Sequence, residues 1–139
     1  CGCTGLRAEG RRKLRRRRGA EIDRGMKESA IQKSIVDFIR AVTPDCVCFA
    51  VPNAARRRKG GRASNGVPGL LRGVSDLIIV TQGQVIFAEV KNETGRASDA
   101  QRAFGEKMQG LGHAWCVWRS IDDVRRTFRV LDVPTRESV

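Results

Sequence analysis

Residues 76–91, DLIIVTQGQVIFAEVK, decide the fold that we expect for this chain. Two apolar runs, about 76–80 and 84–91, are separated by a short polar segment around Gln82 and Gly83. Such runs are typical of strands, and so short a connection predicts an antiparallel hairpin. Side chains two apart on a strand share a face, so Glu89 and Lys91 project together and the hairpin brings Asp76 near them.

Two carboxylates and a lysine at one sheet edge form an unusual group for a protein core. Asp76, Glu89 and Lys91 suit a Mg²⁺ or Mn²⁺ site acting on phosphate, with the carbonyl of Val90 as a further ligand. Lys91 would orient or deprotonate a water molecule, or stabilise negative charge in the transition state. Each residue also has a plainer interpretation, in which Asp76 follows a turn and the strand residues pair on a solvated face.

The charge balance favours a polyanionic partner. The chain has 139 residues, enough for one domain, with a net charge of +12 and a pI of about 10.7. A basic surface of this size binds nucleic acid through release of counterions, although a basic surface without a partner stays the alternative. No apolar run approaches the ~20 residues of a membrane span, and no signal-peptide pattern is present. We therefore expect a cytoplasmic protein.

Two basic segments stand apart from the apolar patterns. Residues 1–25 carry an almost unbroken basic block, which predicts a disordered arm before a single domain over 26–139. The glycine- and arginine-rich segment 54–73 predicts a long loop. Its basic side chains are expected to contact DNA phosphates, the alternative being a solvated loop. They are Arg56, Arg57, Arg58, Lys59 and Arg62.

The remaining patterns predict an α/β fold, in which helices flank a small mixed sheet of about four strands. Helices are expected over about 27–42, 98–111 and 121–131, and further strands over 46–51 and 114–118. Ser98 and Ser120 are expected to cap the second and third helices, and Gln101 fits the partner position of a capping box with Ser98. The five cysteines are interpreted mainly as buried free thiols, and His113 as a loop residue.

The order of the acidic residues and the lysine resembles the PD-(D/E)XK nuclease superfamily, with its restriction-endonuclease-like core, and within it the VRR-NUC family. The resemblance spans about residues 27–131, although Ser75 stands where the family usually has proline. It is carried by the following stretches: Glu28 to Gln32, Pro52-Asn53, Gly66 to Gly69, Gly73 to Leu77, Phe87 to Lys91, Ser98-x-x-Gln101-x-x-Phe104 and Gly112 with 115–118.

The resemblance implies a catalytic set of Asp76, Glu89 and Lys91, with Glu28 as a possible metal ligand and Gln101 setting the Lys91 end of the site. Glu28 also suits the first turn of its helix, and Gln101 the cap alone. The implied activity is Mg²⁺- or Mn²⁺-dependent endonucleolytic cleavage of DNA at branched structures such as Holliday junctions, by a homodimer. The resemblance also implies a bacterial or phage-infected cell as the source. The alternatives are a flap-directed or less specific nuclease and a non-catalytic DNA-binding protein with a nuclease-like fold.

Overall fold

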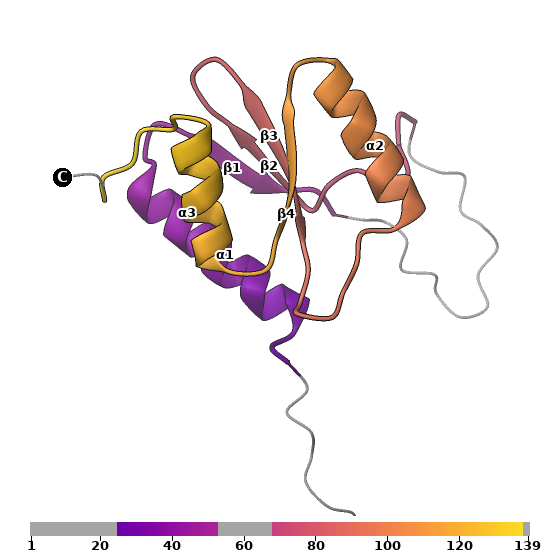
Figure 1. Ribbon diagram of the computed structural model, residues 1–139, viewed down its shortest axis with the longest axis horizontal. Coiled ribbons are helices and arrows are strands. Elements are labelled where there is room, and N and C mark those ends of the chain that lie inside the picture. Colours follow the sequence, from indigo (N-terminus) through magenta and orange to yellow (C-terminus); the bar gives the residue numbers. More distant parts are fainter. Residues whose placement is uncertain (1–24, 53–67, 138–139) are drawn as a thin grey trace, which may run out of the picture.

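The structure is a computed structural model that describes residues 25–52 and 68–137 (Figure 1). The described part has the predicted order of helix, three strands, helix, strand and helix. The observed bounds differ from the predicted ones by one residue at most. The elements are α1 (Glu28–Val42), β1 (Val47–Ala50), β2 (Leu77–Val80), β3 (Val85–Val90), α2 (Asp99–Gly110), β4 (Ala114–Trp118) and α3 (Ile121–Val130).

The four strands form one mixed sheet in the order β1-β2-β3-β4. β1 pairs antiparallel with β2, and β2 pairs antiparallel with β3, which confirms the predicted hairpin. Its register sets Leu77 opposite Ala88. β3 and β4 are parallel because α2 makes the crossover between them, as parallel neighbours require.

Helices cover both faces of this sheet: α1 and α3 lie on one side and α2 on the other (Figure 1). The main core fills the space between the sheet and the α1–α3 pair. In β3, Ile86, Ala88 and Val90 face this core, while Phe87 faces α2 and stacks edge-on against Phe104 at 5.4 Å between ring centroids. Successive side chains of β3 point to opposite faces of the sheet, so Glu89 lies on the α2 side with Phe87, away from the main core.

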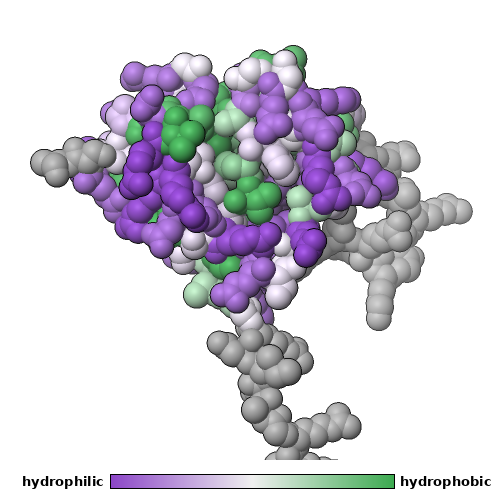
Figure 2. Space-filling model, viewed as in Figure 1, coloured by the Kyte–Doolittle hydropathy of each residue, from purple (hydrophilic) through white to green (hydrophobic). Residues whose placement is uncertain are grey.

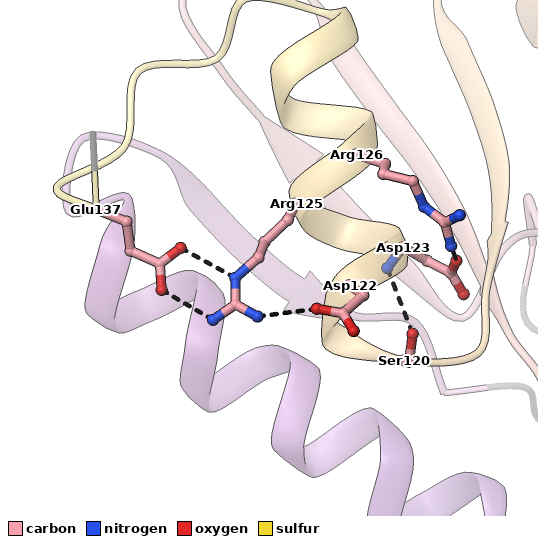
Figure 3. Close-up of polar contacts among 6 residues, drawn as sticks. All are labelled: Ser120, Asp122, Asp123, Arg125, Arg126 and Glu137. Atoms are coloured by element: carbon pink, nitrogen blue, oxygen red, sulfur yellow. Dashed lines mark hydrogen bonds and ion pairs between the residues drawn. The ribbon is translucent and has the colours of Figure 1, made fainter.

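The predicted caps of the second and third helices are present. The Ser98 hydroxyl accepts a hydrogen bond from the Gln101 backbone N–H at 3.2 Å, and the Ser98 N–H donates to Gln101 Oε1 at 2.8 Å. This reciprocal pair is a capping box, which satisfies backbone donors at the start of α2. Ser120 caps α3 with its side chain alone, which accepts a hydrogen bond from the Asp123 N–H (Figure 3).

Arg125 on α3 connects α1, α3 and the C-terminal segment. Its guanidinium donates to both carboxylate oxygens of Glu137, at 3.1 and 3.0 Å, and to Asp122 at 2.9 Å (Figure 3). The same group lies over the Phe38 ring of α1, 5.0 Å from its centroid. The pKa of Glu137 is lowered by its hydrogen bonds with Arg125. The segment after α3 is thereby held against the α1–α3 layer.

The described cysteines are free thiols, and the histidine packs against an aromatic ring. Cys48 is a buried free thiol, as predicted, whereas Cys46 and Cys116 are free but only partly buried. Cys46 falls just before β1, because this strand is shorter than its apolar run. His113 lies between α2 and β4, and its ring meets Phe87 edge-on. Cys1 and Cys3 lie outside the described residues.

The surface seen in Figure 2 is mostly hydrophilic, with smaller hydrophobic areas between. No described helix combines the length and the apolar character that crossing a bilayer requires.

Gly105 lets α2 approach β4 closely, which leads to a stability prediction. A Cβ at this position would lie 2.4 Å from Trp115 Cδ2. Gly105→Ala is therefore expected to lower the unfolding free energy by about 1–3 kcal/mol, as overpacking does. Urea denaturation measures the change. Gly110→Ala in the same helix is the control, because its added Cβ has no neighbour within 4 Å. Equal stability of the two variants would contradict the close packing described here.

Candidate metal centre

The end of the β2–β3 hairpin brings Asp76 and Glu89 together, as the sequence predicted. Asp76 immediately precedes β2, and continuation of the Leu77–Ala88 register places it across from Glu89. The Val90 backbone N–H donates to Asp76 Oδ2 at 2.9 Å. The Asp76 carbonyl accepts from the Val51 N–H at 3.0 Å, which links this end of the hairpin to the end of β1. The position of the Asp76 carboxylate is thus set by backbone groups.

Glu89 is fully buried, although it is an acidic residue. Its Oε2 accepts a hydrogen bond from Gln101 Nε2 at 2.6 Å. Its Oε1 is buried and makes no hydrogen bond of normal geometry with any of the described residues. Unpartnered buried oxygens are rare in native proteins, because they lose their hydration without replacement. The Oε1 atom is therefore available for a ligand that the protein itself does not supply.

Burial, together with the negative charge of Asp76, raises the pKa of Glu89 to about 7. The Ser75 hydroxyl and the positive charge of Lys91 act in the opposite direction and favour the ionised carboxylate. Near neutral pH the Glu89 carboxyl group is thus ionised in only part of the molecules, because its burial and the nearby carboxylate of Asp76 disfavour its charged form. A cation between them would remove that penalty.

Gln101 completes the predicted helix cap and also contacts one residue of the predicted site. Its Oε1 completes the capping box of α2, while its Nε2 donates to Glu89. The start of α2 and the Glu89 carboxylate are therefore held by one side chain. The hydrogen bond goes to Glu89 itself, whereas the expectation had placed Gln101 at the Lys91 end of the site.

Lys91 and Glu28 approach each other at the turn that follows β3. A Cβ added to Gly95 would lie 2.8 Å from Glu28 Oε1, 3.0 Å from Asn92 Oδ1 and 3.4 Å from Lys91 Cδ. The side chains of Glu28 and Lys91 thus flank the same point, where glycine leaves room for both. Lys91 is half-buried, and its backbone N–H donates to the Trp118 carbonyl at 3.0 Å.

Glu28 lies apart from the carboxylate pair. Within 25–52 and 68–137, no three His, Cys, Asp or Glu side chains are grouped closely enough to hold a metal ion. Asp76 and Glu89 are thus the two carboxylates that the fold brings together, and Glu28 reaches the turn at Gly95 from the start of α1. A direct role of Glu28 as a ligand stays a prediction.

The turn after β3 is held together by residues that were not part of the predicted site. Asn92 Oδ1 accepts hydrogen bonds from the Gly95 N–H at 2.7 Å and the Thr94 N–H at 3.2 Å, which closes the turn. Arg119 donates to the carbonyls of Asn92 and Gly95, the latter at 2.7 Å. Asparagine followed by glycine three residues later was a local signal for this turn. No local pattern indicated the role of Arg119, because this residue follows β4 and is distant in sequence from the turn that it contacts.

The predicted DNA-binding residues of the basic loop lie outside the described residues, as does most of the N-terminal arm. They are Arg56, Arg57, Arg58, Lys59 and Arg62.

The residues present fit a hard divalent cation. The Asp76–Glu89 pair offers carboxylate oxygens, which Mg²⁺ and Mn²⁺ prefer over nitrogen or sulfur, while the Val90 carbonyl stays a predicted ligand. The buried Oε1 of Glu89 has no described hydrogen-bond partner, and its carboxylate is repelled by Asp76. A cation would satisfy both features.

Comparison with known proteins identifies the fold. No protein-family model matches the sequence, and no curated protein matches it. A solved structure described as "VRR_NUC domain protein" is similar, with a TM-score of 0.56 and 20% sequence identity; the match covers 76% of this chain and 87% of that one. The expected architecture of three helices and a four-stranded mixed sheet is confirmed. The described part of this chain therefore has the nuclease-like α/β fold of a VRR_NUC domain protein.

Proposed function

We propose that this protein is a divalent-metal-dependent nuclease that hydrolyses phosphodiester bonds in DNA. The observation that carries the proposal is the fully buried Glu89, which faces Asp76 with one oxygen lacking a described hydrogen-bond partner and is followed by Lys91 on the same strand face. A binding protein gains nothing from burying repelling carboxylates, because their desolvation lowers stability. A metal-dependent enzyme needs such a pair. The fold likeness to a VRR_NUC domain protein supports this conclusion.

In this proposal Asp76, Glu89 and the Val90 carbonyl would hold a Mg²⁺ or Mn²⁺ ion, with Glu28 as a further candidate. When bound, the ion would supply an activated water molecule and neutralise charge on the phosphate. The Val90 N–H sets the direction of the Asp76 carboxylate, and Gln101 holds one oxygen of Glu89. These two hydrogen bonds pre-organise the site, so little conformational entropy is lost when it acts.

Lys91 would act on the water or on the phosphate. The lysine ammonium group is a positive charge, and its stem passes the turn at Gly95 beside Glu28. From there it would orient the attacking water, accept its proton when neutral, or stabilise the charge that develops on the phosphate. Each of these roles requires the amine and not merely the aliphatic stem.

For the substrate we propose branched DNA such as a four-way junction, cut by a homodimer. The net charge of +12 supports a nucleic-acid substrate, and the resemblance in sequence motifs favours a branched one. Symmetric cleavage of a four-way junction requires two active sites related by a two-fold axis, which a homodimer would supply. A sedimentation mass equal to one chain at micromolar concentration would contradict the dimer.

The proposed function is tested with a labelled four-way junction, a flap and a linear duplex, each incubated with Mg²⁺, Mn²⁺ or EDTA. We expect cleavage of the junction with either metal and none with EDTA. Preferential cutting of flaps, or equal cutting of all three substrates, would support the nuclease activity but contradict branched junctions as the preferred substrate. Binding without cleavage under any metal would support a non-catalytic DNA-binding protein instead.

A further inference from the structure

An arginine-lined cleft lies beside the candidate metal centre. It has a volume of about 600 Å³ and is formed by residues 93–97, the first turns of α2 and the end of β4. Arg96, Arg102 and Arg119 line it, against a single acidic residue, Glu93. Thr94, Gly95 and Ala97 complete the described lining. We call this the arginine cleft.

Two of the three arginines are held in place by backbone carbonyls. Arg119 donates to the carbonyls of Asn92 and Gly95, and Arg102 donates to the carbonyl of Ala97 at 2.9 Å and forms an exposed ion pair with Asp99. A guanidinium has five N–H donors, so both groups keep further donors for a ligand. Arg96 is exposed and has no hydrogen bond or ion pair with any residue of the described part.

The arginine cleft and the metal centre share a wall. Gly95 lines the cleft, and a Cβ placed on it would touch the side chains of Glu28 and Lys91. On the other side, Arg102 directly follows Gln101, whose amide holds Glu89. A polymer that occupied the cleft would therefore pass next to the predicted catalytic residues.

We infer that the arginine cleft binds the phosphate backbone of the DNA strand adjacent to the phosphate that is cut, an inference that rests on the proposed function. Guanidinium groups pair with phosphate through two parallel hydrogen bonds, and carbonyl-held arginines lose little freedom when they do so. The lining is mostly polar, whereas a protein partner would need apolar anchors. The shared wall at Gly95 makes the neighbouring nucleotides of the same strand the ligand that fits.

The test uses the full chain and a fluorescein-labelled duplex, whose anisotropy is followed in EDTA at several salt concentrations. The test variant is Arg96→Gln/Arg102→Gln. The matched control is Arg126→Gln/Arg129→Gln on α3, at the opposite face of the sheet, which removes the same charge. It also removes the same kind of contact, because Arg126 pairs with Asp123 three residues earlier as Arg102 does with Asp99.

We expect the cleft variant to bind about tenfold more weakly than the control and to lose roughly two units of the log–log salt dependence, one for each phosphate contact. Circular dichroism melting verifies that both variants fold. Equal affinities of the two variants, or no DNA binding by the wild type, would overturn the inference. Displacement of the DNA by polyglutamate at equal charge concentration would also overturn it, since the cleft would then not prefer phosphate.

Cleavage kinetics separate this inference from the proposed function. With Mn²⁺, the cleft variant is expected to have a higher KM and an unchanged kcat, because the cleft binds flanking phosphates and does not touch the reacting atoms. If the cleft variant cleaved DNA with an unchanged KM, DNA binding by the cleft would be contradicted, while the proposed nuclease activity would stand. If the wild type bound DNA through the cleft but never cleaved it, the cleft inference would be supported and the proposed nuclease activity would be contradicted.

Discussion

Lys91→Ala is expected to reduce DNA cleavage by about 10²–10⁴-fold while leaving DNA affinity within about twofold of the wild type. The side chain extends past Gly95 next to Glu28, and its positive charge favours ionised Glu89. Its removal takes away the one amine of the predicted catalytic set. Single-turnover cleavage with Mn²⁺ measures the loss, and anisotropy in EDTA measures binding.

The control for this experiment is Lys107→Ala, which removes one positive charge from the last turn of α2. It is expected to cleave at the wild-type rate. If Lys91→Ala also cleaved at the wild-type rate, Lys91 would have no part in the chemistry. A parallel loss of binding and cleavage would indicate that Lys91 holds the substrate and does not act on it.

Glu89→Gln is expected to have opposite effects on activity and stability. Cleavage should be lost, because an amide is a far weaker ligand for a divalent cation than a carboxylate. In EDTA at pH 8, however, the variant should be more stable than the wild type by on the order of 1–3 kcal/mol. Burial and the charge of Asp76 penalise the ionised carboxylate, and glutamine keeps the shape and the oxygen that accepts from Gln101.

The pH dependence of this gain follows from the pKa of Glu89, which rises from 4.5 to about 7 on folding. Between these values the folded state binds more protons than the unfolded state, so wild-type stability falls as pH rises. The difference between variant and wild type should therefore be small below about pH 4.5, grow towards pH 7 and level off above it. Urea denaturation at several pH values in EDTA measures it.

Glu137→Gln gives a control of the opposite sign. Arg125 lowers the pKa of Glu137, so its carboxylate contributes stability above its unfolded-state pKa that is lost as pH falls. That variant should be less stable than the wild type at pH 8. A Glu89→Gln protein that was also less stable at pH 8 would contradict the unfavourable burial of the Glu89 carboxylate.

Much of this fold was predictable because its signals are local. The two apolar runs of 76–91 gave the hairpin, and the serines at 98 and 120 marked the helix starts that the structure confirms. The convergence of Asp76 and Glu89 followed from strand periodicity and the short turn alone. These features depend on residues close in sequence, so the patterns predict them directly.

The remaining features depend on how distant elements pack. The complete burial of Glu89 and its hydrogen bond from Gln101 require α2 to lie over β3, at a distance that Gly105 permits against Trp115. The contacts of Arg119 with the turn after β3 join residues more than twenty positions apart. Composition and spacing carry no information on such contacts, so the arginine cleft emerges only from the three-dimensional arrangement.

The most direct test of the metal centre is a calorimetric titration of the wild type, Glu89→Gln and Asp76→Asn with Mn²⁺ in the absence of DNA. We predict that the wild type binds Mn²⁺ and that both substitutions weaken binding by at least tenfold, with proton release from the wild type near pH 7 because the Glu89 pKa is about 7. Equal Mn²⁺ affinity in all three proteins, or no binding by the wild type, would contradict a metal centre built on Asp76 and Glu89.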